Sequence, residues 1–399
     1  MATYTQLSYN ITKQLSKLEK KNNGIYFTPP STIIKNIQYL KNINSNFNNI
    51  LEPSCGTGEF LKVISNEFKN SSVYAVEKNN TIFNSIQNLF EDNIQILNDD
   101  FITHNFTTKY DLIIGNPPYF VLNKKNVPKI YNDYYTGRPN IFIIFIIKSL
   151  SLLAENGILS FVLPKSFINC LYYDKTRKFI DENYTILNIE NCNDNYIETK
   201  QETITFVLQN KKSNNNNLFV LKINNYTIFG NKEMIQKVKE LYNDSTTLNK
   251  LGFNVNVGNV VWNQCKDILT DDPSKTRLIY SSDIKNKNLI FKKYKNKKKK
   301  NYIRKKGEDK PLLVLNRGYG VGKYNFEYCL INTNFDYLIE NHLICIRSKN
   351  NENNERLIDM YRKIINSFEN SRTEEFIKLY FGNSAINTTE LNYILPIYL

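Results

Sequence analysis

Apolar runs of two kinds alternate along the first half of the chain. Short runs are typical of buried strands, and segments with apolar residues three or four positions apart are typical of amphipathic helices. Strands are expected at residues 49–52, 73–77, 94–97, 111–114, 158–163, 186–190 and 204–208, and helices at 31–40, 59–68, 141–154 and 172–181. This alternation predicts an α/β fold with a doubly wound, mostly parallel, seven-stranded sheet.

The pattern changes in the second half. A polar stretch at 211–217 is expected to be a loop or linker, and we place a domain boundary between residues 212 and 213. Beyond it we expect a strand pair, a helix, short strands, two helices and a closing strand or coil, at 218–229, 234–241, 254–262, 277–280, 311–315, 324–331, 343–347, 357–365, 373–380 and 391–399. The sequence therefore predicts one domain over 1–212 and a second, mixed α+β domain over 213–399.

The positive charge of the chain is concentrated in the second half. Residues 1–210 hold 20 Lys and Arg against 19 Asp and Glu, and residues 211–399 hold 32 against 19. Ten basic residues, interleaved with aromatic residues, lie in the basic segment 291–306. Because basic side chains neutralise phosphates and aromatic rings stack on bases, this half predicts a nucleic-acid partner. The alternative is a solvated loop in a lysine-rich sequence. The candidate contacts are Lys292, Lys293, Lys297, Arg304 and Arg317.

The sequence lacks the marks of a secreted or membrane protein. No amino-terminal segment has the pattern of a signal peptide, and the longest apolar run, 141–147, is too short to span a bilayer. The six cysteines show no Cys-x-x-Cys spacing, and the two histidines lie far apart. We expect a cytoplasmic protein, in a bacterium or, for a viral source, in an infected cell or virion, without a disulfide framework or metal site.

One stretch, 112–120, joins a buried strand to a rigid polar turn. Pro117 and Pro118 end the strand and fix the backbone. Asn116 is left at the carboxyl end of a strand, where open α/β sheets bind ligands. Its side-chain oxygen can accept a hydrogen bond from an amino group, and Tyr119 offers a flat face for stacking. The stretch predicts a site that holds a planar ring by its exocyclic amine.

Three earlier strands also end in carboxylates. Glu52 comes before a glycine-bearing turn at 54–58, Glu77 follows the next strand, and Asp100 follows the third. Glycine turns between strand and helix let a ligand approach the backbone, and a carboxylate about 20 residues later commonly holds a ribose diol. The spacing fits one nucleoside-like ligand across the sheet's carboxyl edge. The alternative is that each carboxylate only caps a helix.

These motifs, in this order, resemble the gamma-class amino-methyltransferases of restriction–modification systems, with a TaqI-like motif order. They are Tyr-Phe-Thr-Pro at 26–29, Glu-Pro-Ser-Cys-Gly-Thr-Gly at 52–58 and Asn-Pro-Pro-Tyr at 116–119, followed by a basic carboxyl-terminal domain. The similarity covers residues 24–210, and the second half resembles a target-recognition domain in texture. The resemblance implies a Rossmann-like methyltransferase sheet and transfer of a methyl group to the 6-amino group of adenine in a short duplex DNA site.

The resemblance also implies S-adenosyl-L-methionine as the methyl donor, without a metal. By motif, 26–29 would border the methionine end, Glu52 and 54–58 would hold the amino-acid part, Glu77 would bind the ribose, and Asp100 with Phe101 would hold the adenine. The residues expected to bind the donor are Tyr26, Phe27, Thr28, Pro29, Glu52, Ser54, Cys55, Gly56, Gly58, Glu77, Asp100, Phe101 and Asn116.

Members of this family turn the target base out of the duplex. By the resemblance, the Asn116 side chain and the Pro117 carbonyl would accept the two amino hydrogens, while Tyr119 and Tyr196 would stack on opposite faces of the base, and Lys200 would contact the flipped nucleotide. Two acceptors favour a pyramidal nitrogen whose lone pair faces the sulfonium methyl. Attack is then direct and in line, and catalysis comes from positioning and electrostatic preorganisation.

Several other readings of the motifs stay open at this stage. Asn-Pro-Pro-Tyr also occurs in enzymes that methylate a protein glutamine amide, and RNA adenine and cytosine amino-methylation are further alternatives. A non-catalytic DNA-binding specificity subunit is an alternative of another class. The favoured interpretation is the modification enzyme of a type II-like system, a monomer that binds duplex DNA and no membrane, and that shares its site with a cognate restriction endonuclease where one exists.

Overall fold

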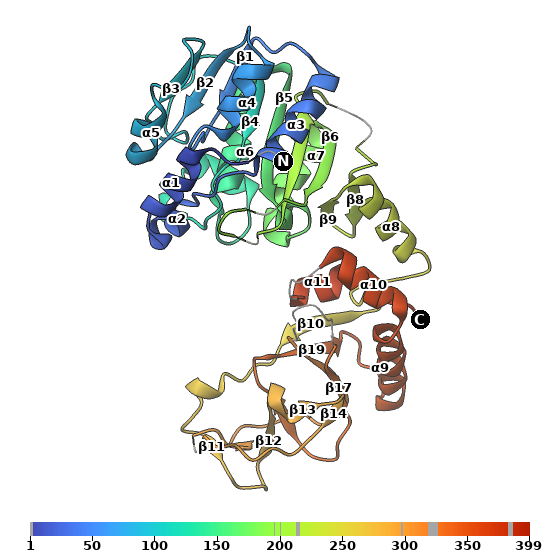
Figure 1. Cartoon of the computed structure of the whole chain (residues 1–399). Coiled ribbons are helices and arrows are strands. Elements are labelled where there is room, and N and C mark those ends of the chain that lie inside the picture. The colour runs from blue at the N-terminus through green and yellow to red at the C-terminus, as the bar shows by residue number, and fades with distance from the viewer. Residues whose placement is uncertain are drawn as a thin grey trace. The chain divides into compact units, whose positions relative to one another are not determined.

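The structure is a computed structural model that describes residues 3–194, 196–199, 201–212, 216–296, 298–317, 326–381 and 386–399 (Figure 1). By its internal contacts the chain divides into two compact units, Met1–Ile235 and Gln236–Leu399. The division lies beyond the boundary expected after residue 212, and residues 216–235 belong to the first unit.

The described residues of the first unit form a seven-stranded sheet in the order β3-β2-β1-β4-β5-β7-β6. Only β7 runs antiparallel to its neighbours β5 and β6; the other strand pairs are parallel. This confirms the predicted mostly parallel α/β sheet. The strands are β1 (Asn49–Glu52), β2 (Ser72–Val76), β3 (Ile94–Leu97), β4 (Tyr110–Gly115), β5 (Leu153–Pro164), β6 (Thr185–Cys192) and β7 (Thr203–Gln209).

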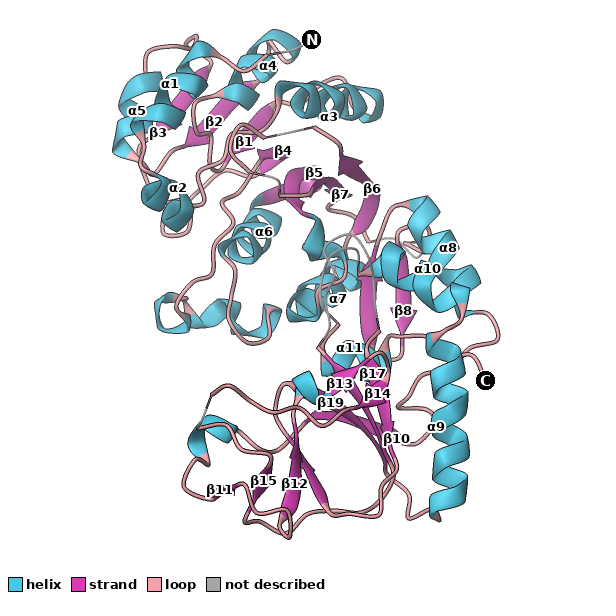
Figure 2. Ribbon diagram, turned by 60° about the horizontal axis from the view of Figure 1, so that its bottom comes forward, coloured by secondary structure: helices cyan, strands magenta, loops and turns pink. Residues whose placement is uncertain are grey.

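Helices cover both faces of this sheet, as Figure 2 shows for α3 and α6. Because side chains alternate along a strand, Leu112 and Ile114 of β4 pack with α3 and α4, while Ile113 between them packs with α6. All three are fully buried. The helices are α1 (Gln6–Gln14), α2 (Lys17–Asn23), α3 (Pro30–Ile43), α4 (Glu59–Glu67), α5 (Asn80–Ile86), α6 (Ile141–Leu152) and α7 (Asp174–Asn183).

The junction between α6 and β5 differs from the expected one. The helix ends at Leu152 and the strand begins at once with Leu153, whereas the sequence predicted a strand only from residue 158. Leu153 pairs with Tyr110 of β4 across an irregularity in the register, and Asn156 adopts a left-handed conformation with φ of 61°. Residues 154–157 are mostly polar or small, so the sequence pattern did not predict a strand there. Pairing with β4 extends the strand beyond its apolar run.

A hairpin of β8 (Val220–Ile223) and β9 (Tyr226–Phe229) packs on the first unit. Phe229 stacks on Phe206 of β7, with ring centroids 5.8 Å apart. The buried Arg177 donates from Nε to the Thr227 carbonyl oxygen at 2.6 Å, and Asp174 Oδ1 accepts from the Thr227 amide at 2.7 Å. These contacts explain why residues 216–235 lie with the first unit. Helix α8 (Lys232–Tyr242) spans the division.

The second unit is a mixed α+β structure, as predicted. In its described residues one antiparallel sheet has the order β10-β19-β16-β17, a second has the order β11-β15-β12-β18, and β13 pairs with β14. Among the residues that the structure describes in this unit, the helices α9, α10 and α11 follow these strands along the chain. The elements are β10 (Phe253–Val257), β11 (Leu269–Thr270), β12 (Thr276–Ile279), β13 (Ile284–Lys285), β14 (Asn288–Leu289), β15 (Tyr302–Ile303), β16 (Leu312–Asn316), β17 (Tyr328–Ile331), β18 (Tyr337–Ile339), β19 (Leu343–Ser348), α9 (Asn354–Phe368), α10 (Ser371–Tyr380) and α11 (Thr388–Tyr393).

The end of the chain corrects one prediction. Part of 391–399, expected to be a closing strand or coil, belongs to helix α11. A capping box begins this helix: the Glu390 amide donates to Asn387 Oδ1 at 2.9 Å, and the Asn387 amide donates to Glu390 Oε2 at 3.1 Å. The capping box starts a helix at Thr388, and this helix extends into the apolar run from which the strand or coil was predicted. Across the described part of the chain, none of the helices combines the length and apolarity that a membrane crossing requires.

Candidate functional site

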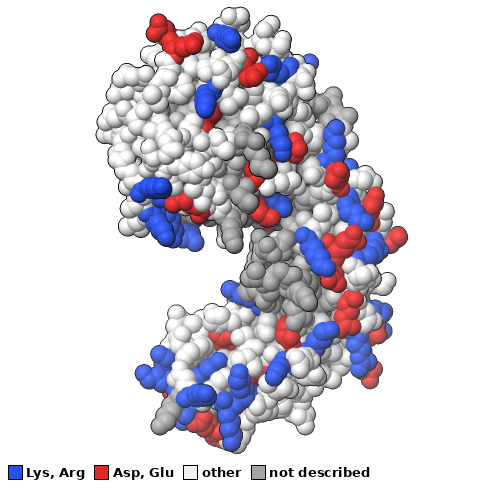
Figure 3. Space-filling model, viewed as in Figure 1, with Lys and Arg blue, Asp and Glu red and all other residues white. Residues whose placement is uncertain are grey.

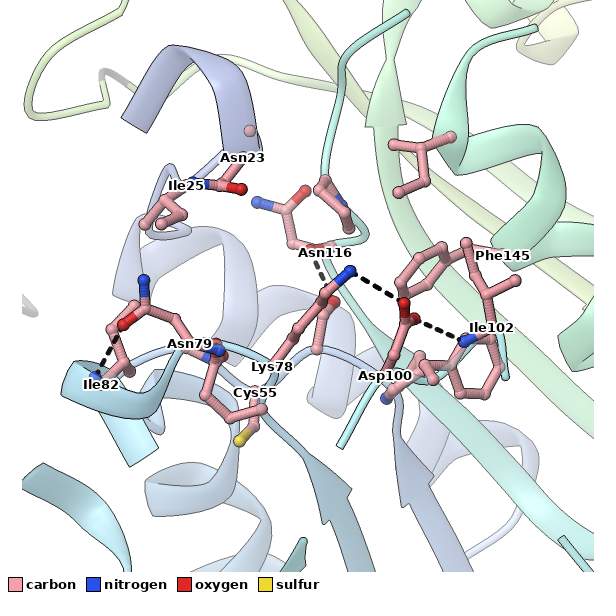
Figure 4. A pocket seen from close by; sticks show the side chains of 18 of the residues that line it. Asn23, Ile25, Cys55, Lys78, Asn79, Ile82, Asp100, Ile102, Asn116 and Phe145 are labelled. Atoms are coloured by element: carbon pink, nitrogen blue, oxygen red, sulfur yellow. Dashed lines mark hydrogen bonds and ion pairs between the residues drawn. The ribbon is translucent and has the colours of Figure 1, made fainter. Parts of the chain in front are cut away.

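A cavity of about 760 Å³ opens at the carboxyl edge of the first unit's sheet, where β1 to β4 end. This volume suits a nucleoside-sized ligand. Most of the residues expected to bind the donor line it: Tyr26, Phe27, Thr28, Glu52, Ser54, Cys55, Gly56, Glu77, Asp100, Phe101 and Asn116. Pro29 and Gly58 are not among the lining residues, although both belong to segments that line the cavity. Figure 4 shows part of this lining.

The turn between β1 and α4 brings backbone close to the cavity. Gly56 and Gly58 both adopt left-handed conformations, with φ of 54° and 80°. A Cβ on Gly56 would lie 3.2 Å from the Phe27 ring, and one on Gly58 would lie 2.6 Å from the Phe90 ring. The Cys55 amide donates to the Val76 carbonyl oxygen of β2 at 2.9 Å, which ties the turn to the sheet. Glycine is required here by both conformation and space.

Glu52 ends β1 and is 1% exposed. Its Oε2 atom has no hydrogen-bond partner among the residues that the structure describes. Burial, with the charge of nearby Glu77, raises the pKa of the Glu52 carboxyl well above its ordinary value. An unpartnered buried carboxylate oxygen beside a cavity is a ready acceptor for a ligand ammonium group.

Glu77 follows β2 and is also buried. Its Oε2 accepts from the Gly56 amide at 2.9 Å and its Oε1 from the Asn79 amide at 2.7 Å. Burial raises the pKa of Glu77, while these amide hydrogen bonds oppose the shift. Each carboxylate oxygen keeps a further lone pair, so Glu77 can accept two ligand hydroxyl groups without losing its own support.

Asp100 is held between a lysine and a backbone amide. Its Oδ1 accepts from the Ile102 amide at 2.9 Å, and its Oδ2 lies 2.8 Å from Lys78 Nζ. Figure 4 shows Lys78 reaching across to Asp100. The Lys78 side chain is 74% exposed, so this ion pair is well solvated and weak. A ligand amine can share Asp100 with it, because the carboxylate has free lone pairs.

Phe101, next to Asp100, forms an apolar wall. It is buried against Phe145 of α6, with ring centroids 4.8 Å apart. Lys148 of α6 donates to the carbonyl oxygens of Ile102 and His104 at 2.9 and 2.6 Å. The same ammonium lies 5.2 Å from the centre of the Phe101 ring. Helix α6 therefore fixes the path of the loop after β3.

Asn116 sits just beyond β4, at the same edge. Its Nδ2 donates to the Tyr26 carbonyl oxygen at 3.1 Å, which points Oδ1 away from that segment. Ser54 Oγ donates to the Asn116 carbonyl oxygen at 3.2 Å. The target motif is thus linked directly to both donor motifs predicted from the sequence. Oδ1 accepts a hydrogen bond from the Tyr119 hydroxyl.

The two aromatic residues expected to stack on a base do not line this cavity. The Tyr119 hydroxyl lies 2.7 Å from the Val162 carbonyl oxygen, and its ring packs edge-on against Phe142. Tyr196 is 8% exposed, with its hydroxyl 3.4 Å from Thr203 Oγ1. Burial raises the pKa of both phenols, so both hydroxyls are neutral. Of the Asn-Pro-Pro-Tyr motif, Asn116 and Pro118 line the cavity, and Pro117 is buried.

The basic residues predicted to contact nucleic acid lie mostly in the second unit. Lys292, Lys293, Arg304 and Arg317 are exposed, and Figure 3 shows Lys and Arg side chains gathered on one part of this unit. Lys200 and Lys297 lie outside the described residues.

A buried ion pair anchors the basic segment 291–306. Asp283 Oδ2 lies 3.2 Å from Arg277 Nη2, and both side chains are buried. Asp283 Oδ1 also accepts from the Tyr294 hydroxyl at 2.5 Å, and Arg277 Nη1 donates to the Asn301 carbonyl oxygen at 2.9 Å. The buried pair thereby holds Tyr294 and Asn301 of the basic segment in place, while the exposed basic side chains of the segment face solvent.

The lining residues that the sequence analysis missed include Lys78, Asn79, Ile102 and Phe145. Lys78 and Asn79 directly follow Glu77, so the strand-end rule that found Glu77 could also have found them. Phe145 belongs to an apolar run that the sequence analysis read only as helix core. Nothing in such a run marks which residue reaches a cavity.

Residues 3–197 match the family model of the Eco57I restriction-modification methylases. The chain is 29% identical to the type II methyltransferase M.CvrRI of Paramecium bursaria Chlorella virus XZ-6E, over 97% of each chain. It is 35% identical to the modification methylase CviBIII of Paramecium bursaria Chlorella virus NC1A, over 44% of this chain and 47% of the relative. A solved structure of the type IIG restriction endonuclease BpuSI aligns with 98% of this chain and 60% of that chain, at 11% identity and a TM-score of 0.48.

Proposed function

We propose that the protein is a site-specific DNA methyltransferase that modifies the exocyclic 6-amino group of adenine, which the match of residues 3–197 to the Eco57I restriction-modification methylase family supports. One observation carries the proposal. A single cavity brings Glu52, Glu77 and Asp100 from three strand ends to the same edge as Asn116. That arrangement suits a nucleoside with a cationic amino-acid tail held next to an amine acceptor.

The residues present fit S-adenosyl-L-methionine. The unpartnered Oε2 of Glu52 would accept the ammonium group, and Glu77 would accept the ribose hydroxyls. Asp100 would accept the adenine amine beside Phe101, with the Ile102 amide holding its carboxylate in place. The backbone of Gly56 lines the cavity without a side chain, so the amino-acid part of the donor could approach it closely. When bound, this donor supplies an electrophilic methyl group.

The target amine would be held by the Asn116 side chain and the Pro117 carbonyl. The Tyr26 carbonyl fixes the Asn116 amide by accepting from Nδ2. Oδ1 accepts from the Tyr119 hydroxyl and has a second lone pair with which it would accept from the target amine. Two acceptors draw on both N–H groups and favour a nitrogen lone pair directed at the methyl carbon. We expect catalysis to rest on this preorganisation rather than on a general base. Reaching the site from a duplex requires the adenine to flip out. Because Tyr119 and Tyr196 do not line the cavity, stacking on the base would require both rings to leave the positions in which they are packed.

The second unit would recognise the DNA site. Its exposed Lys292, Lys293, Arg304 and Arg317 suit phosphate contacts. The similarity to M.CvrRI spans nearly the whole of both chains, which supports a role as the modification enzyme of a type II restriction–modification system. A cognate endonuclease acting on the same site is the partner such a system implies.

The experiment is to incubate the protein with donor labelled in its methyl group and with duplex DNA, RNA or a protein extract in parallel. We expect label in duplex DNA alone, recovered as N6-methyl-2′-deoxyadenosine after digestion to nucleosides. Sequencing of the product would give the site. Label in cytosine would overturn the adenine assignment, and label only in protein or RNA would overturn the DNA assignment.

A further inference from the structure

The connection between β4 and α6 is a long, ordered segment that the proposed function does not yet use. This β4–α6 loop, residues 121–140, follows directly after the Asn-Pro-Pro-Tyr motif. It contains two short 3-10 helices, Lys124–Asn126 and Lys129–Tyr134. Connections of this length are uncommon in compact units, and those that are ordered are usually functional.

The inner side of the β4–α6 loop is anchored in the core. Val127, Tyr131 and Tyr135 are between 4% and 7% exposed and belong to the core cluster around α6. The ends of the loop are closed by two backbone hydrogen bonds, Leu122 N–H to Pro139 O at 2.8 Å and Ile141 N–H to Phe120 O at 2.9 Å. Side chains on its outer side are therefore held on a fixed frame, which lowers the entropy lost when they bind a partner.

The outer side of the loop is cationic with an exposed apolar residue at its centre. Lys124, Lys125 and Lys129 are exposed, and none of them has an ion pair within the described part of the chain. Ile130, next to Lys129, is 74% exposed. The loop holds one acidic residue, Asp133. Leaving an isoleucine in water costs free energy that contact with a partner would recover.

Position decides which partner fits. Leu122, Asn126, Val127 and Pro128 of the same loop line the cavity that holds Asn116. Lys124, Lys125 and Lys129 are sequence neighbours of these lining residues, so they lie close to the cavity. Unpaired lysines suit phosphates, and an apolar side chain between them suits the sugar and base edges of a groove.

We propose that the outer side of the β4–α6 loop is a second duplex-DNA contact, carried by the catalytic unit itself. Lys124, Lys125 and Lys129 bind backbone phosphates next to the target nucleotide, and Ile130 contacts the groove there. This inference rests on the proposed function, since it takes duplex DNA as the substrate. It differs from it by assigning part of the DNA affinity to the first unit rather than to the basic second unit.

The test compares the triple variant K124Q/K125Q/K129Q with the matched control K69Q/K211Q/K212Q. Lys69 precedes β2. Lys211 and Lys212 follow the antiparallel strand β7, whose last residue, Gln209, pairs with Ile158 of β5. These exposed control lysines therefore lie at the amino edge of the sheet, opposite the carboxyl edge where the cavity opens. Affinity for a duplex carrying the modified site is measured as a function of salt. Each phosphate contact contributes a slope of about 0.9 in log affinity against log salt.

We expect the triple variant to flatten this slope by about 2 to 3 and to weaken DNA binding about 10- to 100-fold at moderate salt. Donor affinity and the melting temperature should match those of the wild type, which shows that the variant folds. The control should keep the wild-type slope. Ile130→Ser should weaken DNA binding without changing the slope, because it removes no charge.

A triple variant with the same slope and affinity as its control would overturn the inference. So would an equal loss of RNA binding with DNA methylation unchanged, since the loop would then serve another partner. A wild-type protein that neither binds nor methylates duplex DNA would instead overturn the proposed function, and the two failures are thus distinguishable.

Discussion

Glu52 is the residue whose surroundings constrain the site most. It is buried, it lacks a partner at Oε2 among the described residues, and its pKa is raised by burial and by Glu77. A raised carboxyl pKa means that the folded, donor-free protein holds protons that the unfolded chain has already released. Stability without donor should therefore fall as the pH rises above the ordinary carboxyl range toward the raised pKa.

Donor binding should follow the opposite trend with pH. The ligand ammonium pairs with the carboxylate, so binding releases a proton wherever Glu52 is protonated in the free protein. We expect donor affinity to rise with pH across the window above the ordinary carboxyl pKa, by up to about tenfold per pH unit for one proton released. Calorimetry in two buffers of different ionisation enthalpy measures the proton count. Residual binding by Glu52→Gln should release none, and an unchanged release would assign the proton to another group.

Asn116→Ala separates binding from chemistry. It removes the amide that the Tyr26 carbonyl orients and leaves Glu52, Glu77 and Asp100 in place. We expect the methyl-transfer rate to fall about 10²- to 10³-fold, as for the loss of one preorganised polar contact, while donor affinity stays within a small factor. Single-turnover assays and donor titration measure the two quantities.

Asn22→Ala is the matched control for this variant, since Asn22 also lines the cavity but lies in α2, outside the Asn-Pro-Pro-Tyr motif. It should leave both quantities near their wild-type values. A variant at Asn116 that keeps its rate would contradict the assignment of this residue as the amine acceptor.

At the scale of elements, helix α6 holds the loop after β3, which carries Asp100 and Phe101. Lys148→Met keeps the aliphatic stem against Phe101 but removes the donor to the carbonyl oxygens of Ile102 and His104. Leaving those acceptors unsatisfied should cost about 1–3 kcal/mol of unfolding free energy, and it should loosen the loop that carries Asp100. We expect donor affinity to weaken more than the maximal rate, as measured by KM and kcat.

Lys109→Met offers the matched comparison. Lys109 Nζ also donates to a backbone carbonyl, that of Ser151, but at the start of β4, away from the cavity. It should change stability without changing the KM for the donor. Equal changes in KM from both variants would argue that Lys148 has only a general structural role.

Elements with a strong local signal were predictable from the sequence. The strands β1 and β3 have the expected bounds, and β2 and β4 differ by one residue at each end, because buried parallel strands are nearly continuous apolar runs. The two-residue strands β11 and β13 to β15 were not separately predicted, since pairs of residues carry no periodicity. The prediction of a strand or coil over 391–399 was wrong at its start, because helix α11 is determined by a capping box and not by apolar spacing.

The residues of the site likewise divide into those with a local sequence signal, which were predicted, and those without one, which were not. Strand ends with acidic residues could be found from sequence because parallel strands share one edge, so Glu52, Glu77 and Asp100 were expected to converge. The pairing of Lys78 with Asp100 and the wall made by Phe145 depend on side-chain packing between elements. No single-chain pattern encodes such contacts.

At the scale of the whole molecule, the two units divide the work proposed for them. The first unit has its own sheet, its own hydrophobic clusters and all the residues that line the cavity. We expect a fragment of residues 1–242, which keeps all of α8, to fold and to bind the donor within about threefold of the intact chain, since every lining residue is present. Site-specific methylation should fall below detection, because the basic segment is missing.

The intact chain is the control, and isothermal titration and the labelled-donor assay are the measurements. A folded fragment that cannot bind the donor would show that the second unit completes the cavity. A fragment that still methylates only one sequence would move recognition into the first unit.

The carboxylates at the ends of β1 and β2 have a consequence for turnover. The contacts proposed for Glu52 and Glu77 involve an ammonium group and a ribose, and both survive when the methyl group leaves. The product, S-adenosylhomocysteine, lacks the methyl group and with it the sulfonium charge, so these carboxylates would bind it nearly as firmly as the donor. On this proposal we expect product inhibition, and turnover in a cell would depend on how quickly the product is removed.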